Sequence, residues 1–269
     1  MRIVAPRGRE TPVVVEVPHA GLALDAETLC TLIAPASAVG RDADLYVDEL
    51  YADAPDHGAT MLVATTSRYV VDLNRAETDI DKDSVVGGGT AVRATRGLVW
   101  RLTSDGAAAI PGPLARAEVD RRLELYYRPY HRALAELLEQ KRARFGYAVV
   151  LAAHSMPSTG RAGHGDPDEV RADVVPGTRG RTSAGAAFID AVDAHARAAG
   201  LSVAHDTPYR GGYTTAHYGR PDLGVHVVQV ELARRLYMDE ATLRRSARFE
   251  ETRRFCAGLV AALAAVPRP

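Results

Sequence analysis

Short runs of apolar, mostly β-branched residues recur along the chain and alternate with segments of helical periodicity. The runs end at Gly, Pro or a polar turn, and they span residues 12–17, 59–66, 68–74, 147–153, 201–206 and 225–232. Continuous apolar runs of this length are typical of strands that are covered on both faces. Their alternation with helices predicts an α/β fold with a mostly parallel sheet between two helical layers.

The helical patterns have recognisable ends. The segment 116–146 carries apolar residues at three- and four-residue spacings and stops at a glycine, and 182–200 stops at another. Thr182 or Ser183 is the expected N-cap of the second helix. The last helix is expected over 239–266.

Composition limits the classes of protein to which the chain can belong. With 269 residues and 46% hydrophobic content, we expect one domain over 1–269. The net charge of −1 favours a small-molecule partner over nucleic acid or membrane. Cys30 and Cys256 cannot build a disulfide framework, which indicates a reducing, cytoplasmic setting, and both are expected to be buried and inert. We find neither an apolar signal region nor an 18-residue apolar run, and we expect a soluble monomer or small homo-oligomer.

Two histidines follow or end predicted strands. His19 stands in "VPHAG" and His154 in "AAHSMPS". Ligands of open α/β sheets collect at the carboxyl ends of the strands, so the two histidines could share a divalent metal with a carboxylate as third ligand. The stretch "RDADLYVDELY" offers Asp42, Asp44 and Asp48. The alternative is that both histidines are structural and that the acids start a helix or face solvent.

Glu231 is a candidate general base for such a site. We interpret it as the only acid inside an otherwise apolar strand, "HVVQVEL". A hydrolytic metal site needs a base beside the attacking water, and a carboxylate can serve. The alternative is an ion pair of Glu231 with Arg234 or Arg235.

Arginines after predicted strands are candidates for binding a substrate carboxylate. Asn74 and Arg75 close the run "RYVVDLNR", and Arg210 precedes two glycines that allow a close approach of the backbone. Each of these arginines could equally be a surface residue. Ser155 lacks the GxSxG context of a serine hydrolase. The glycine-rich stretch 85–93 lacks the GK[ST] of a phosphate-binding loop and does not match the dinucleotide-binding motif GxGxxG.

Eight motifs together resemble one family. They are "VPHAG", "RDADLYVDELY", "VVDLNR", "YYRPYH", "AAHSMPS", "VPGTRGRTSAG", "PYRGGYTTAHYG" and "VQVELARRLYMDE", and they occur in the order typical of the N-formylglutamate amidohydrolase family over about 12–242. The resemblance implies a distant relation to zinc carboxypeptidases and aspartoacylases, with a three-layer α/β fold around a mixed sheet. It implies metal-dependent hydrolysis of N-formyl-L-glutamate to formate and glutamate in histidine degradation.

The resemblance also assigns the metal ligands. His19 and His154 match the metal-binding histidines, and the expected ion is one zinc. The carboxypeptidase pattern His-x-x-Glu would need an acid at position 22, where this chain has Leu22. We therefore place the acidic ligand at Asp44, with Asp42 as the fallback.

The resemblance assigns the remaining roles as well. Glu231 matches the catalytic glutamate, and the pair Asn74 and Arg75 resembles the pair that holds a substrate carboxylate. Arg210 is expected to hold the second carboxylate, with Arg179 as a third candidate. The alternatives are a zinc amidohydrolase for another N-acyl amino acid, a peptidase, and a non-catalytic binding protein. The loop 156–182 differs from many members and could change the acyl preference, and no role is assigned to His131 and His217.

Overall fold

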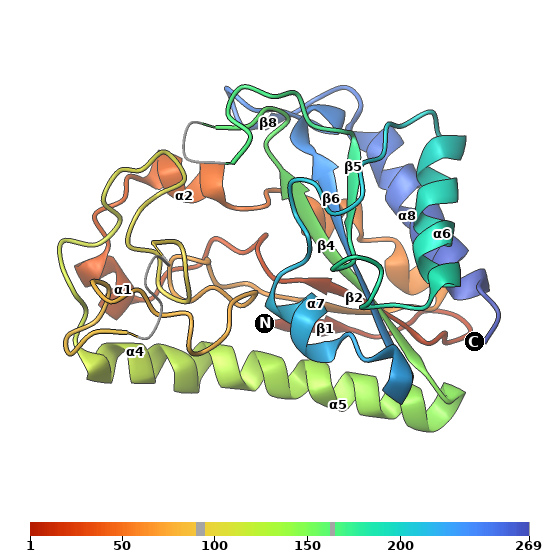
Figure 1. Cartoon of the computed structure of the whole chain (residues 1–269), viewed down its shortest axis with the longest axis horizontal. Coiled ribbons are helices and arrows are strands. Elements are labelled where there is room, and N and C mark those ends of the chain that lie inside the picture. Colours follow the sequence, from red (N-terminus) through yellow and green to blue (C-terminus); the bar gives the residue numbers. More distant parts are fainter. Residues whose placement is uncertain (90–94, 162–164, 269) are drawn as a thin grey trace.

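A six-stranded sheet forms the centre of the protein (Figure 1). The computed structural model describes residues 1–89, 95–161 and 165–268. The strand order is β1-β3-β2-β4-β6-β5, with β3, β2, β4 and β6 parallel and with β1 and β5 antiparallel at the edges. The strands are β1 (Arg2–Val4), β2 (Val13–Val17), β3 (Thr60–Val63), β4 (Ala148–Met156), β5 (Val174–Gly177) and β6 (Val225–Ala233). The expected mixed, mostly parallel sheet is confirmed.

Helices cover both faces of this sheet. α4 (Arg116–Arg122) continues through a π-helical turn into α5 (Arg128–Phe145), which lies along one face, whereas α3 (Val47–Leu50), α6 (Ala186–Ala198) and α8 (Phe249–Ala265) cover the other (Figure 1). Side chains alternate between the two faces, so the odd-numbered valines of β2 pack with α6 and α8, and Val14 packs with α5. The result is an α/β sandwich with a core on each side of the sheet.

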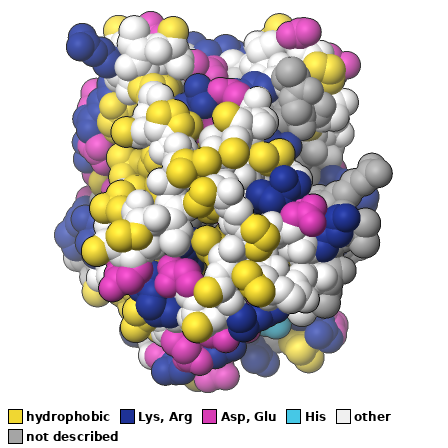
Figure 2. All heavy atoms as spheres, turned by 90° about the vertical axis from the view of Figure 1, so that its left-hand side faces the viewer, with side chains coloured by type: hydrophobic (Ala, Val, Ile, Leu, Met, Phe, Trp, Pro, Cys, Tyr) yellow, Lys and Arg dark blue, Asp and Glu magenta, His cyan; other side chains and the backbone are white. Residues whose placement is uncertain are grey.

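Short elements complete the chain. They are α1 (Ala26–Thr31), α2 (Ala36–Asp42), α7 (Tyr213–Tyr218), the 3₁₀ turns Ala54–His57, Pro221–Leu223 and Arg234–Leu236, and the hairpin of β7 (Met238–Asp239) and β8 (Arg244–Arg245). α1 and α2 lie on the face that Figure 2 shows, where hydrophobic side chains are interspersed with charges of both signs. That the protein does not bind nucleic acid stays a prediction.

Four expected strands are confirmed and two are wrong. The run 68–74 forms turns rather than a strand, because β3 already has β1 on one side and β2 on the other. The run is apolar because Val70, Val71 and Leu73 pack into the core on the α5 face. The run 201–206 makes only one bridge, to Val174. Edge strands β1 and β5 were not anticipated.

The expected helices are present, and two of them begin later than expected. The helix over 116–146 is confirmed, but α6 begins after Gly185, because the Ser183 hydroxyl donates to the carbonyls of Thr178 and Val227 instead of capping a helix. α8 begins at Phe249, because the β7–β8 hairpin occupies the preceding residues. Cys256 is buried as expected, whereas Cys30 is exposed, contrary to expectation. In the described ranges, no helix is long and apolar enough to cross a membrane.

Candidate metal centre and active site

A cavity of about 670 Å³ opens at the carboxyl ends of the central parallel strands. His19 lies just beyond β2, His154 lies near the end of β4, and Glu231 lies near the end of β6. In the parallel ladder His154 is paired directly with Glu231. The sheet topology therefore brings together residues that are far apart in the sequence, at the edge where α/β sheets bind ligands.

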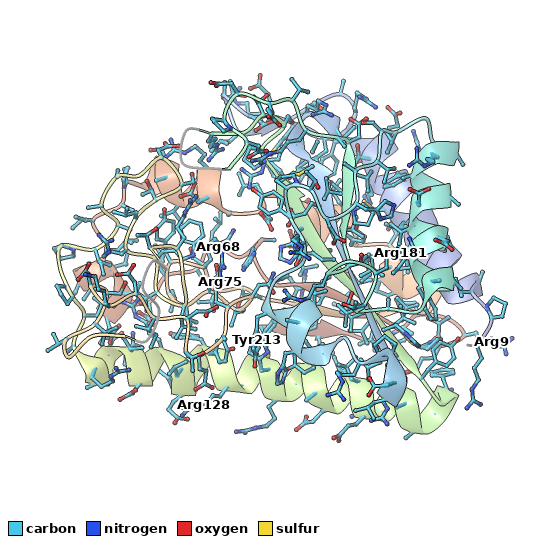
Figure 3. All side chains as sticks on the ribbon, in the orientation of Figure 1. Arg9, Arg68, Arg75, Arg128, Arg181 and Tyr213 are labelled. Carbon is cyan, nitrogen blue, oxygen red and sulfur yellow. The ribbon has the colours of Figure 1, made fainter. Side chains whose placement is uncertain are left out.

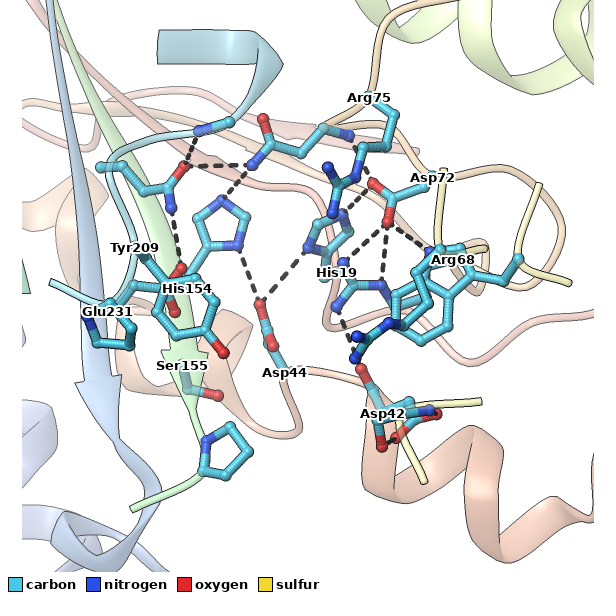
Figure 4. A pocket seen from close by; sticks show the side chains of 18 of the residues that line it. His19, Asp42, Asp44, Arg68, Asp72, Arg75, His154, Ser155, Tyr209 and Glu231 are labelled. Atoms are coloured by element: carbon cyan, nitrogen blue, oxygen red, sulfur yellow. Dashed lines mark hydrogen bonds and ion pairs between the residues drawn. The ribbon is translucent and has the colours of Figure 1, made fainter. Parts of the chain in front are cut away.

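Three buried residues form a potential metal site: His19, Asp44 and His154. Their ligand atoms all lie within 4.8 Å of one another. Asp44 Oδ2 lies 3.0 Å from His154 Nδ1 and 3.7 Å from His19 Nδ1 (Figure 4). Zinc bonds of about 2.0–2.2 Å put two ligands of a tetrahedral ion about 3.4 Å apart, which is close to both distances from Asp44 to the histidines.

The other two candidate acids have different partners. Asp42 accepts hydrogen bonds from the Tyr69 hydroxyl at 2.6 Å and from the backbone and hydroxyl of Ser104. Asp48 pairs with Arg2 near the surface, at 3.7 Å. The structure thus brings Asp44, and neither of its neighbours in the motif, between the two histidines.

Asp44 is held in its charged form. Burial alone would raise its pKa, but the hydrogen-bonding contacts with His154 and His19 hold the pKa well below the usual range of a carboxyl. Its second oxygen, Oδ1, lies 3.4 Å from Arg234 Nη2. An ionised carboxylate is the form that a divalent cation requires. The contact with Asp44 also raises the pKa of His154, against the effect of burial, and a bound cation would displace that proton.

Asp72 was missed from the sequence, although it belongs to the "VVDLNR" motif. Its carboxylate is fully buried and accepts hydrogen bonds from Arg68, from Trp100 Nε1 and from the backbone of Asn74. It also lies 2.8 Å from His19 Nε2. Burial would raise the pKa of Asp72, but His19 and Arg68 keep it well below the usual value. An acid that holds the outer nitrogen of a metal-binding histidine fixes the orientation of the ring.

Glu231 lies beside His154 and is 6% exposed. Gln229 Nε2 donates to Glu231 Oε1 at 2.9 Å. Neither Arg234 nor Arg235 makes the alternative ion pair, because their guanidinium groups bind other acceptors, mainly backbone carbonyls and Asp173. Burial raises the pKa of the Glu231 carboxyl, which favours its use as a proton acceptor near neutral pH.

A second buried acid corrects the interpretation of Glu231 as the only one in a strand. Glu16 lies inside β2 and is fully buried. Its Oε1 accepts from the Thr214 hydroxyl at 3.1 Å and from the Tyr130 hydroxyl at 3.2 Å, and burial raises its pKa. The sequence signal was present in "PVVVEV", since Val14 shares a strand face with Glu16 and its apolar side chain indicates that this face is covered too.

Two cavity arginines are available for an anion. Arg75 and Arg210 both line the cavity, and among the described residues neither guanidinium has a hydrogen-bond or ion-pair partner. Figure 3 shows Arg75 near Arg68, in the segment after β3. Asn74 is buried, and its amide binds within the protein. Arg179 is exposed and does not line the cavity, and its Nη1 donates to the carbonyl of Gly211 at 3.2 Å.

The two histidines without an assigned role are apart from the metal cluster. His131 lies between the Leu73 carbonyl and the Tyr218 hydroxyl, each 3.0 Å from a ring nitrogen. Burial lowers its pKa to about 4. The His217 ring stacks on Tyr213 at a centroid distance of 4.8 Å. His131 therefore contributes to packing in its neutral form.

Comparison with known proteins places the chain in a family. Residues 11–238 match the family model of N-formylglutamate amidohydrolase. The N-formylglutamate deformylase of Pseudomonas aeruginosa is 35% identical over 247 residues, covering 87% of this chain and 84% of that protein. The enzyme of the same name from Pseudomonas putida is 34% identical over 232 residues, with 85% and 82% covered.

Solved structures agree with this match. The crystal structure of N-formylglutamate amidohydrolase from Ralstonia eutropha superposes with a TM-score of 0.87 at 31% identity, covering 98% of this chain and 96% of that one. A gene product of Agrobacterium tumefaciens, 20% identical, superposes with a TM-score of 0.60 and supports the fold alone. The chain belongs to the N-formylglutamate amidohydrolase family.

Proposed function

We propose that the protein hydrolyses the amide bond of N-formyl-L-glutamate to formate and L-glutamate. The deformylase relatives and the family match support this activity. The observation that carries it is one cavity that contains a buried His-Asp-His cluster, the acid Glu231 and two unpaired arginines. Such a cavity can bind a dicarboxylate substrate and activate water against its amide.

We propose zinc as the bound ion, held by His19, Asp44 and His154. Two imidazole nitrogens and one carboxylate oxygen are ligands that zinc prefers, whereas magnesium and calcium prefer oxygen ligands alone. When bound, zinc lowers the pKa of a water molecule and stabilises negative charge on a carbonyl oxygen. Three protein ligands leave one position open, as a catalytic zinc site requires.

Glu231 acts as the general base and acid. It takes a proton from the water that attacks the formyl carbon and delivers a proton to the nitrogen of the departing glutamate. Its position beside His154 and its raised pKa support this role. His19 and His154 would serve as metal ligands and do not transfer the proton.

Arg75 and Arg210 bind the two carboxylates of the substrate. The formyl group offers little surface for recognition, so selectivity has to come from the glutamate part. The cavity lining contains seven arginines, Arg75 and Arg210 among them, and five acids, Asp42, Asp44, Asp72, Asp79 and Glu231, and this excess of positive charge suits a dianion. Arg179 lies outside the cavity and would act only by holding the backbone of Gly211.

The proposal also covers the metabolic role of the protein, its location and the relation of its fold to other enzymes. We propose a place in histidine degradation, a cytoplasmic location and a distant relation of the fold to zinc carboxypeptidases. A second candidate function, hydrolysis of another N-acyl amino acid, would use the same cluster and base with a different fit on the acyl side.

Formate release from N-formyl-L-glutamate tests the proposal. The purified protein is assayed before and after chelation and after zinc is added back, with N-formyl-L-aspartate and N-acetyl-L-glutamate as competing substrates. We expect activity that is lost on chelation, restored by zinc and highest with the formylglutamate. Metal-dependent activity on another compound would overturn the specificity, and full activity after verified metal removal would overturn the mechanism.

A further inference from the structure

Gln229 connects three parts of the active site. It lies on β6 two residues before Glu231, so that both side chains point to the same face of the sheet, and it is 3% exposed. Its Nε2 donates to Glu231 Oε1 at 2.9 Å. Its Oε1 accepts from the backbone N–H of Gly212 at 2.9 Å and from Asn74 Nδ2 at 3.2 Å. None of the catalytic steps described above uses Gln229.

The hydrogen bonds determine which way both amides point. A backbone N–H can only donate, so the Gln229 atom that faces Gly212 must be the oxygen, and the nitrogen must face Glu231. The same reasoning applies to Asn74, whose Oδ1 accepts from the backbone N–H of Thr214 at 2.9 Å. Asn74 Nδ2 therefore faces Gln229. Gln229 Nε2, Asn74 Nδ2 and the two backbone N–H groups each have an acceptor, and Asn74 Nδ2 also lies 3.3 Å from His154 Nε2. Reversing either amide would break its bond to a backbone N–H.

Glycines allow the loop that carries Arg210, residues 209–212, to approach this network. A Cβ atom on Gly212 would lie 2.4 Å from Asn74 Nδ2, and a Cβ atom on Gly177 would lie 2.7 Å from the backbone nitrogen of Gly211. The backbone N–H of Tyr213 also donates to the carbonyl of Asn74 at 3.1 Å. The loop that carries Arg210 is thus joined to the segment that carries Arg75, and Gln229 lies at the junction.

We propose that Gln229 is a positioning residue that holds the general base Glu231 at a set distance from the two carboxylate-binding arginines. Its amide nitrogen orients Glu231 toward the scissile bond. Its amide oxygen fixes the Asn74–Gly212 junction and with it Arg75 and Arg210. The inference rests on the proposed function, because it assigns Gln229 a part in that reaction.

Two substitutions test the roles of the amide nitrogen and the amide oxygen separately. Gln229→Met removes both donor and acceptor at nearly constant size. Gln229→Glu keeps an acceptor for Gly212 and Asn74 but places an oxygen where Glu231 has its donor. Gln140, the other glutamine of the chain, is exposed on α5, and Gln140→Glu is the matched control for the added charge.

The test measures kcat and KM for formate release, the affinity for the product L-glutamate by calorimetry, bound zinc and Tm. For Q229M we expect kcat to fall at least about tenfold and both KM and the product Kd to rise at least about fivefold, with zinc content retained. For Q229E we expect a similar fall in kcat, with KM and product Kd within about threefold of wild type. Q140E should match wild type throughout.

The outcomes separate this inference from the proposed function. If wild type releases formate but Q229M keeps its kcat and KM, Gln229 is not a positioning residue, whatever its effect on Tm. If Q229M and Q229E had the same kcat, KM and product Kd, the separate roles assigned to the amide nitrogen and the amide oxygen would be wrong. If wild type releases no formate at all, the proposed function fails, and the inference fails with it. Product binding in Q229M reports on the arginine side without catalysis.

Discussion

Asp72 Oδ1 lies 2.8 Å from His19 Nε2, which leaves His19 Nδ1 as the ring nitrogen that faces Asp44. Asp72 is itself fixed by Arg68 and Trp100. A buried carboxylate in this position selects the tautomer of the histidine and increases its basicity as a ligand. Residues outside the potential metal-binding cluster therefore fix the orientation of one of its histidines.

Asp72→Asn should weaken zinc binding by about 10- to 100-fold, the usual effect of losing such an orienting partner. The substitution keeps the shape of the side chain but removes its negative charge. Competition of the protein with a zinc-binding dye measures the affinity directly. Asp83→Asn, an exposed acid in the same region, is the control and should leave the affinity unchanged. An equal affinity of D72N and wild type would refute the role of Asp72.

Glu231→Gln should leave zinc bound and lower kcat by about 10²–10⁴-fold, because the amide cannot accept the proton of the attacking water. The amide has nearly the size of the carboxyl, so the fold should be unaffected. Steady-state rates and zinc content measured on the same sample check both halves of the expectation. A zinc-loaded E231Q protein with the wild-type rate would exclude Glu231 as the base.

Arg75→Ala should raise KM for N-formyl-L-glutamate by about 10- to 100-fold, since loss of a charged hydrogen-bond partner costs about 1.5–3 kcal/mol. Arg210→Ala should act in the same direction. Arg179→Ala is the comparison, because Arg179 does not line the cavity and should change KM by less than about threefold by the same reasoning. If R179A raised KM more than R75A, the assignment of the carboxylate-binding arginines would be reversed.

Periodicity and strand-end motifs predicted much of this protein. The four parallel strands, the long helix on the α5 face and the positions of His19 and His154 at strand ends follow from local pattern. The run 68–74 did not, because burial in a core makes a turn segment as apolar as a strand. The edge strands β1 and β5 are short, and their pairing depends on neighbours distant in the sequence.

Residues that support the site were harder to foresee than those that perform the chemistry. Asp72, Gln229 and Glu16 each have a partner far away in the sequence, His19, Asn74 and Thr214 respectively, at separations of 53, 155 and 198 positions. A single sequence does not show such pairs. Asp44 stood beside two other acids in one motif, and only its geometry sets it apart. The sequence motif identifies candidate ligands, and the three-dimensional structure shows which of them lies beside the histidines.

His131 should make the protein less stable in mild acid. Burial lowers its pKa in the folded state to about 4, whereas an unfolded histidine titrates near 6.5. Between these values the unfolded chain binds the extra proton, so the stabilising contribution is complete above about pH 6.5 and is lost as the pH falls toward about 4. Between about pH 7.5 and about pH 5 the loss amounts to ~2 kcal/mol of unfolding free energy.

His131→Gln isolates this contribution, because glutamine can still bond to the Leu73 carbonyl and the Tyr218 hydroxyl but does not titrate. Urea unfolding of both proteins at the two pH values should show a pH-dependent loss that is ~2 kcal/mol smaller in H131Q than in wild type. His57→Gln, at an exposed position, should keep the wild-type pH dependence. The same pH dependence in wild type and H131Q would mean that His131 is free to take up a proton in the folded protein, in conflict with its burial between α5 and the segment before Asn74.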